Sequence, residues 1–115
     1  MGEKPERLSA DALLAGTGER AIVVVLMGIA NHDNLGGIFR NAAAFGVDGV
    51  ILDADCCDPL YRKAIRVSSG ATMSVPTAWL EPGQDVTDLL TRYGFQGLAL
   101  SPAAARVMVL VAALP

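Results

Sequence analysis

Apolar residues in this chain gather in short runs, and the spacing within these runs predicts strands and helices in alternation. Residues 21–28 are almost continuously apolar and rich in β-branched side chains, which is typical of a strand buried on both faces. Residues 34–45 carry an apolar stripe at helical spacing, with Asn34 as the expected N-cap and Gly46 as the expected end. Residues 49–52 predict a second strand, so this stretch is interpreted as a βαβ unit with a right-handed crossover.

The same reasoning divides the rest of the chain into further elements. We expect helices over residues 59–67 and 85–93, and strands over residues 73–75, 96–100 and 107–111. We favour a strand for the last segment, although its Ala-rich flanks would also support a buried helix. Residues 1–20 are polar with one short amphipathic stretch, which predicts a linker or a loosely docked helix before a domain over residues 21–115. The predicted fold class is α/β with a mostly parallel sheet.

Composition and charge narrow the class of protein. With 115 residues, of which 52% are hydrophobic, the chain suffices for one domain with a real core. Its net charge of −3 argues against a nonspecific nucleic-acid binder, and an aromatic content of 5% does not indicate a base-stacking platform. No apolar run reaches the roughly 18 residues that a membrane-spanning helix needs, and the charged N-terminus does not resemble a signal peptide. We therefore expect a cytoplasmic protein with no membrane partner.

Two adjacent cysteines, Cys56 and Cys57, follow the second predicted strand among several aspartates. Neighbouring cysteines rarely pair, so we expect no structural disulfide, which fits a reducing compartment. Their spacing matches no common zinc pattern, and the single histidine, His32, lies far away in the sequence. We therefore expect no metal site and interpret the segment as a loop with two small buried thiols.

The most informative polar residues lie between the first two predicted strands, where open α/β sheets place their ligand chemistry. Asn34 stands near the start of the predicted helix, and Arg40 lies almost two turns into it. Gly36 and Gly37 remove side chains from the first turn, which lets a ligand or another strand approach closely. An arginine at this place can bind a phosphate through two parallel hydrogen bonds. A capping Asn and an exposed surface Arg would give the same pattern.

A second polar cluster consists of Arg62, Lys63 and Arg66, of which the two arginines share one helix face. Together with Arg40 they could form a positive strip on an otherwise acidic protein, which suits phosphate contacts to RNA. A solvated helix face is the alternative. The small residues around Ser68 resemble a ligand loop or simply a helix end. Neither GxGxxG nor GxxxxGK[ST] occurs, which disfavours nicotinamide and P-loop nucleotide binding.

Three segments of the sequence carry motifs of a known family. The residues concerned are Asn34-Leu35-Gly36, Ile38, Arg40, Ala42 and Phe45-Gly46 in the first and most specific motif, and then residues 58–62, 66–70 and 100–102. In residue type and spacing they resemble the SpoU/TrmH family of RNA ribose 2′-O-methyltransferases. The resemblance covers roughly residues 20–102, which is most of the chain.

The resemblance implies a SPOUT (α/β-knot) fold, in which a Rossmann-like parallel sheet is followed by a C-terminal segment that threads into a trefoil knot. It also implies S-adenosylmethionine as cofactor, rRNA or tRNA as substrate, and a homodimer with composite active sites. The catalytic roles would fall on Arg40, which helps to deprotonate the ribose 2′-hydroxyl, and on Asn34, which supports the site. Because a guanidinium holds its proton tightly, electrostatic positioning of the hydroxyl is the safer description. RNA binding would fall on Arg40, Arg62, Lys63, Arg66 and Ser68, and cofactor binding on Leu100, Ser101 and Pro102.

The sequence departs from the family at one early position and at its end. Met27 stands where many relatives carry an acidic residue. The Gly-Glu-Gly loop and the Ser-Leu-Asn helix, which build the cofactor pocket and complete the knot in the family, do not occur. We therefore expect the front part of the domain, its knot-forming segment absent or unseen, and weak S-adenosylmethionine binding at most. The alternative is a noncatalytic RNA-binding or dimerisation module on the same fold, and a third possibility is a hydrolase-like or nucleotide-binding domain with accidental motif similarity.

Overall fold

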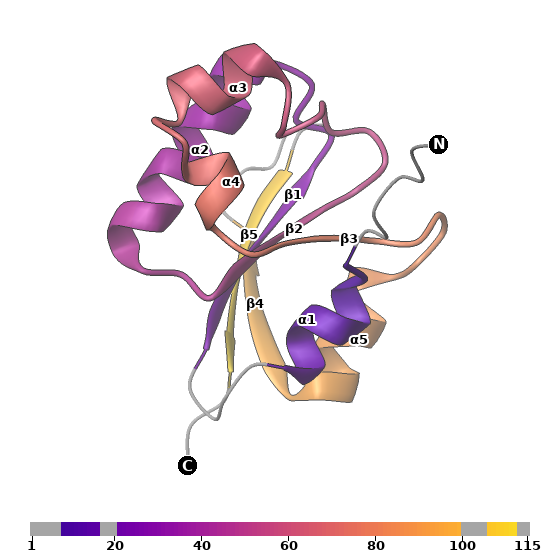
Figure 1. Ribbon diagram of the computed structural model, residues 1–115. Helices are drawn as coiled ribbons and strands as arrows, with labels where there is room; N and C mark the ends of the chain where they lie inside the picture. The colour runs from indigo at the N-terminus through magenta and orange to yellow at the C-terminus, as the bar shows by residue number, and fades with distance from the viewer. Residues whose placement is uncertain (1–7, 17–20, 100–105, 113–115) are drawn as a thin grey trace, which may run out of the picture.

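A five-stranded sheet forms the centre of the protein (Figure 1). The computed structural model describes residues 8–16, 21–99 and 106–112. In spatial order the strands are β3 (Thr77–Trp79), β2 (Gly49–Leu52), β1 (Ile22–Met27), β5 (Arg106–Ala112) and β4 (Phe95–Ala99). The first three are parallel, whereas β5 runs antiparallel to both of its neighbours, β1 and β4. The α/β class is confirmed, and the one antiparallel strand, β5, lies between the parallel half of the sheet and β4.

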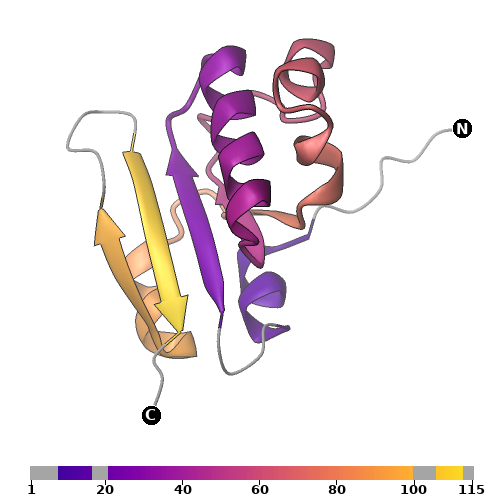
Figure 2. The same cartoon turned by 90° about the vertical axis from the view of Figure 1, so that its left-hand side faces the viewer.

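Helices cover both faces of this sheet (Figure 2). The helices on one face are α2 (His32–Phe45), α3 (Arg62–Val67) and α4 (Ala71–Ser74), and those on the other are α1 (Ala10–Ala15) and α5 (Val86–Tyr93). Val24 and Leu26 of β1 belong to the core beneath the first group, whereas Val23 and Val25 belong to the core beneath the second. Burial on both faces explains why this strand is a continuous apolar run.

The crossover helix α2 begins and ends at residues that obey local capping rules. Asn31 is its N-cap, because its side-chain oxygen accepts hydrogen bonds from the backbone N–H groups of Asp33 (2.8 Å) and Asn34 (3.1 Å). The prediction of Asn34 as the cap is therefore wrong, and its carboxamide is not used for capping. Gly46 ends the helix at a φ of 71°, as predicted. With 14 residues α2 is the longest helix of the described chain, and no helix there is long and apolar enough to cross a bilayer.

The segment between β2 and β3 differs most from the prediction. The Asp58 carboxylate accepts a hydrogen bond from the Leu60 N–H at 2.9 Å, so a turn occupies the place where a helix was expected to begin. Residues 73–75 were predicted as a strand, but α4 extends to Ser74 and β3 begins only at Thr77. Pro76 explains the shift, since a proline forces the residue before it into an extended conformation and thereby ends the helix.

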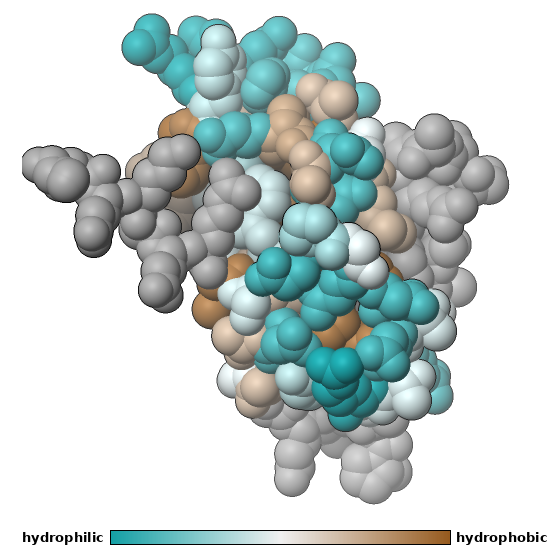
Figure 3. All heavy atoms as spheres, turned by 90° about the vertical axis from the view of Figure 1, so that its right-hand side faces the viewer, coloured by the Kyte–Doolittle hydropathy of each residue, from teal (hydrophilic) through white to brown (hydrophobic). Residues whose placement is uncertain are grey.

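Polar contacts join α1 to α5 on the second face. The Asp11 carboxylate accepts hydrogen bonds from Gln84 Nε2 at 3.1 Å, Arg92 Nη1 at 3.2 Å and the Tyr93 hydroxyl at 3.2 Å. Figure 3 shows hydrophilic side chains gathered over these two helices, in the lower part of the view. The contacts join residues more than 70 positions apart, so α1 is part of the same folded unit as α5.

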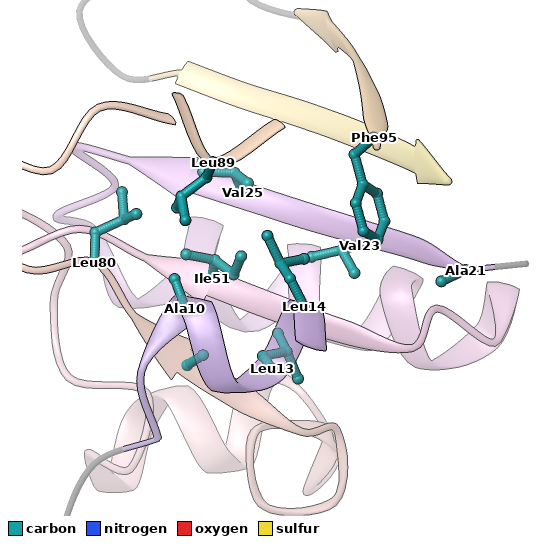
Figure 4. Packing of buried hydrophobic residues seen from close by; sticks show 11 residues of the cluster. Ala10, Leu13, Leu14, Ala21, Val23, Val25, Ile51, Leu80, Leu89 and Phe95 are labelled. Atoms are coloured by element: carbon teal, nitrogen blue, oxygen red, sulfur yellow. The ribbon is translucent and has the colours of Figure 1, made fainter. Parts of the chain in front are cut away.

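Beneath these contacts α1 contributes to the core (Figure 4). Ser9 caps the helix by accepting a backbone hydrogen bond at 3.0 Å, and Leu13 and Leu14 are buried against β1 and β2. The amphipathic stretch of the N-terminal segment is thus a docked helix. Residues 1–7 and 17–20 lie outside the described part.

The last predicted strand is confirmed as β5, and the buried-helix alternative is wrong. β5 pairs with β1 along the full length of β1, from Ile22 opposite Val111 to Met27 opposite Arg106. The predicted helix and strand before it are also confirmed, as α5 and β4. The loops after β1 and β2 lie at the carboxyl ends of these parallel strands, where α/β sheets place their ligand sites.

Candidate nucleic-acid interface

The chain leaves the carboxyl end of β1 through residues 28–31 and enters α2. Asp53, directly after β2, fixes this passage, because its Oδ1 accepts hydrogen bonds from the N–H groups of Gly28 (3.0 Å) and Asp55 (3.1 Å). The Cys57 N–H donates to the Ile29 carbonyl at 2.9 Å. The loops after β1 and β2 are thereby joined, and the start of α2 is held in place relative to the sheet.

The two glycines of the first turns of α2 have different surroundings. A Cβ on Gly36 would lie 2.9 Å from Val67 Cβ and 3.1 Å from the Ala64 carbonyl oxygen, both in α3. A Cβ on Gly37 would meet no atom within 4 Å. Gly36 therefore allows the close approach of α3, whereas Gly37 borders open space. The element that closely approaches Gly36 is helix α3, and not the ligand or strand that was expected.

Asn34 and Arg40 are both exposed on α2. Neither side chain forms a hydrogen bond or ion pair with the described part of the chain, so both are available to a ligand. Six residues of helix separate them by about 9 Å along the axis and about 120° around it. One ligand can touch both groups only if the arginine side chain reaches back toward the N-terminal end of α2, near the carboxyl ends of the strands.

Helix α3 places the basic cluster beside the start of α2. Arg62, Lys63 and Arg66 are all exposed. Lys63 Nζ lies 3.3 Å from the Asp33 carboxylate in the first turn of α2, with both side chains about half exposed. Such an exposed pair contributes little to stability, but it neutralises part of the local charge. Arg62 and Arg66 form no ion pair with the described residues, so their guanidinium groups remain free for phosphates.

An open hollow of about 670 Å³ lies against this cluster, and its lining residues are Asp58, Leu60, Tyr61, Arg62, Lys63 and Arg66. Leu60 and Tyr61 are 61% and 57% exposed, so two large side chains with apolar surface border the three cations. The Tyr61 ring contacts the His32 ring, with centroids 4.5 Å apart. This aromatic pair cannot be read from the sequence, because His32 and Tyr61 are distant along the chain and meet only when α3 packs on α2.

Comparison with known proteins decides the family. Residues 21–113 match the SpoU rRNA Methylase family, and this range includes β1, α2 with its Asn34 and Arg40, and the basic helix α3. The chain belongs to the SpoU rRNA methylase family.

Individual SpoU-family relatives support this assignment. An uncharacterized tRNA/rRNA methyltransferase of Mycobacterium tuberculosis is 46% identical over 80 residues, which cover 70% of this chain and 28% of the relative. A 23S rRNA (guanosine-2′-O-)-methyltransferase of Nitrosomonas europaea is 41% identical over 56% of this chain and 25% of its own. The SpoU methyltransferase AviRb from Streptomyces viridochromogenes, solved in complex with AdoMet, superposes with a TM-score of 0.61 and 26% identity over 76% of this chain and 34% of that one. The chain thus spans between a quarter and about a third of the length of these relatives.

Of the other residues predicted for the site, Ser68 is buried and residues 100–102 lie outside the described part of the chain. Ser68 is only 1% exposed, and its hydroxyl donates to the Ile65 carbonyl at 3.0 Å and accepts from the Thr72 N–H at 3.3 Å. The structure therefore contradicts an RNA contact by this side chain, which instead joins the end of α3 to α4. Residues 100–102, predicted to bind the cofactor, lie outside the described residues.

The two cysteines of this SpoU-family chain are unsuited to nucleophilic chemistry. Burial is the main cause that raises the pKa of Cys56 to about 12, and its thiol donates a hydrogen bond to the Leu26 carbonyl at 3.2 Å. Burial likewise raises the pKa of Cys57. The thiolate is the reactive form, and the raised pKa values lower its fraction in both groups near neutral pH. Among the described residues no group of three or more His, Cys, Asp or Glu side chains is placed to hold a metal ion.

Proposed function

We propose that this protein takes part in S-adenosylmethionine-dependent methylation of a ribose 2′-hydroxyl in rRNA or tRNA. The observation that carries the proposal is Arg40, an exposed guanidinium in the first family motif, on a helix that packs against the basic helix α3. The family assignment and the printed activities of relatives support the reaction class. The RNA contacts proposed here come from Arg40, Arg62, Lys63 and Arg66.

The residues of α2 can position a ribose by charge and hydrogen bonding. The Arg40 guanidinium can bind a phosphate through two hydrogen bonds and place a positive charge beside the 2′-oxygen, where negative charge develops as its proton leaves. The Asn34 carboxamide can donate to and accept from the ribose hydroxyls. The first two turns of α2 are held in place by the Asn31 cap, by the Asp53 contacts and by the packing of α3 against Gly36. Positioning of this kind lowers the barrier without a change in the protonation of the arginine.

The residues predicted to bind the methyl donor, 100–102, lie outside the described part of the chain. When bound, S-adenosylmethionine supplies an electrophilic methyl group to the 2′-oxygen. At the described carboxyl edge, Asp53 Oδ1 accepts hydrogen bonds from the N–H groups of Gly28 and Asp55. The second candidate is a noncatalytic RNA-binding module on the same fold, which is favoured by the exposed Arg62 and Arg66, since they form no ion pair with the described residues.

Methyl transfer from labelled S-adenosylmethionine to rRNA and tRNA transcripts tests the proposal, using the protein at the length at which the cell makes it. Arg40→Ala should lower the rate by about 100-fold or more, because it removes an electrostatic contact to the reacting group. Asn41→Ala, the next and also exposed position of α2, is the matched control and should retain the rate. Circular dichroism should show the same helix content in both variants.

Three outcomes would count against the proposal or a part of it. Full activity of Arg40→Ala would remove this residue from its role. Methylation of a base rather than a ribose, read from the modified nucleoside, would overturn the reaction class. RNA binding without transfer to any rRNA or tRNA would favour the noncatalytic module.

A further inference from the structure

The hollow at α3 combines an aromatic ring, on which an RNA base can stack, with free cations that can bind phosphates. We propose that the hollow is a subsite for an unpaired RNA base, which stacks on Tyr61 while Arg62 and Arg66 bind the flanking phosphates. The inference rests on the proposed function and deepens it, because it names single-stranded or looped RNA as the substrate class.

Tyr61 is suited to stack with a base. Tyr61 is 57% exposed, so a ligand can reach part of its aromatic surface. The contact with His32, at 4.5 Å between centroids, orients the ring from the first turn of α2. A pre-oriented aromatic loses little conformational freedom when a base stacks on it, and stacking accepts any of the four bases. The exposed Leu60 beside it extends the apolar surface.

The charges around Tyr61 are suited to the RNA backbone. The hollow is lined by three cations and one carboxylate, Asp58, whose Oδ1 is already occupied by the Leu60 N–H. Lys63 forms an ion pair with Asp33, so Arg62 and Arg66 are the cations of this hollow that lack an ion pair with the described residues. They lie one helical turn apart, about 6 Å along α3, which is close to the spacing of successive phosphates in an extended strand. Hydrophilic side chains at the height of α3 form the top of the molecule in Figure 3.

This arrangement favours an unpaired strand over a duplex. In an A-form helix the faces of the bases are covered by their neighbours, so an aromatic side chain can stack only on a base that has left the stack. The low content of Phe, Trp and Tyr predicted no stacking platform, but the fold brings the Tyr61 ring together with the imidazole of the single histidine, His32, beside the basic residues. A loop or single strand can therefore place one base on Tyr61 and present a neighbouring ribose toward Arg40 on the adjacent helix.

The test is fluorescence anisotropy with a short labelled single-stranded RNA and with the same strand annealed to its complement. Tyr61→Ala should weaken binding of the single strand by about tenfold and leave duplex binding within about twofold. Tyr61→Phe should bind the single strand like the wild type, because it keeps the ring. Phe45→Ala is the matched control, since Phe45 is also an exposed aromatic, 81% exposed, at the far end of α2. Arg62→Ala and Arg66→Ala should each reduce the salt dependence by about 0.7 in the logarithmic slope.

The outcomes separate this inference from the proposed function. Equal single-strand binding by wild type and Tyr61→Ala would overturn the subsite, as would equal losses for single strand and duplex, or no RNA binding at all. If Arg40 still governed methyl transfer, the proposed function would survive that failure. Conversely, Tyr61-dependent binding of single strands without any methyl transfer would support the subsite and overturn the catalytic proposal.

Discussion

The contact of α2 with α3 can be tested with two Gly→Ala substitutions at neighbouring positions of α2. Gly36→Ala adds a Cβ that would lie 2.9 Å from Val67 Cβ and 3.1 Å from the Ala64 carbonyl oxygen. Both neighbours are rigid, since one is a backbone atom and the other is the branch point of a side chain. The added methyl group must therefore push α3 away from α2, at a cost of about 1–3 kcal/mol for overpacking.

Gly37→Ala is the matched control for this change. It adds the same methyl group to the next position of the same helix, where no atom lies within 4 Å. Both substitutions gain the same helix propensity, about 1 kcal/mol for Gly→Ala, so this contribution cancels when the two variants are compared. Gly37→Ala should be more stable than the wild type by about 0.5–1 kcal/mol, and Gly36→Ala should be less stable than Gly37→Ala by about 1–3 kcal/mol.

Urea unfolding followed by far-UV circular dichroism measures this difference directly. The midpoints of the two variants should separate with little change in the slope m. In thermal unfolding the same difference corresponds to roughly 4–12 °C in Tm. Equal stability of the two variants would refute the inference that Gly36 is required for the approach of α3. If the packing is as described, Gly36→Ala should also weaken RNA binding, because Arg62 and Arg66 move with α3.

Two further predictions concern the opposite face and the buried thiols. Leu14→Ala should destabilise the protein by about 2–4 kcal/mol in the same unfolding assay, because Leu14 is 3% exposed in the core. The control Leu60→Ala, at a position that is 61% exposed, should cost less than about 1 kcal/mol. Similar losses of stability in both variants would mean that α1 is not docked. Burial raises the pKa of Cys56 to about 12, so in a Cys57→Ala variant its alkylation rate should still rise between pH 9 and 11 without reaching a plateau. The fold favours the protonated thiol, so its contribution to stability is present below the ordinary pKa of 9.0 and is lost as pH rises toward 12; a plateau near pH 9 would contradict this burial.

The elements that the sequence predicted well are those whose signal is local. β1 and β2 are uninterrupted apolar runs, and the end of α2 is marked by Gly46, which adopts the left-handed conformation that glycine favours. The chemistry of the first motif is also local, since Asn34 and Arg40 lie on one helix. Their exposure is consistent with the predicted roles, which stay predictions until activity is measured.

The errors arise where neighbouring signals compete or where tertiary contacts decide. Two asparagines, Asn31 and Asn34, could each cap α2, and the earlier one does so because its side chain reaches the free N–H groups of the first turn. The apolar residues around Val75 fit a strand or a helix, and Pro76 decides between them. Ser68 occurs in a small polar turn that suggests a ligand loop, yet its hydroxyl is used to join two helices.

The parallel pairing of β1 with β2 was predicted from the βαβ pattern, but the positions of β4 and β5 and the direction of β5 could not be predicted, because they depend on contacts between distant segments. Nothing local in residues 106–112 states that β5 pairs with β1 or that it runs antiparallel. The aromatic pair beside the basic cluster is hidden for the same reason, since His32 and Tyr61 meet only in the folded chain.

The position of β5 has a consequence for the order in which the protein can fold. β1 is among the first elements of the described chain, but one of its two edges is closed only by β5, the last one. During synthesis on the ribosome, the central strand therefore has an unsatisfied backbone edge until almost the whole of this chain has emerged. An apolar strand with an unpaired edge can be bound by chaperones or can pair with a wrong strand. Slow translation upstream of β5 prolongs this exposure and should therefore reduce the yield of native protein.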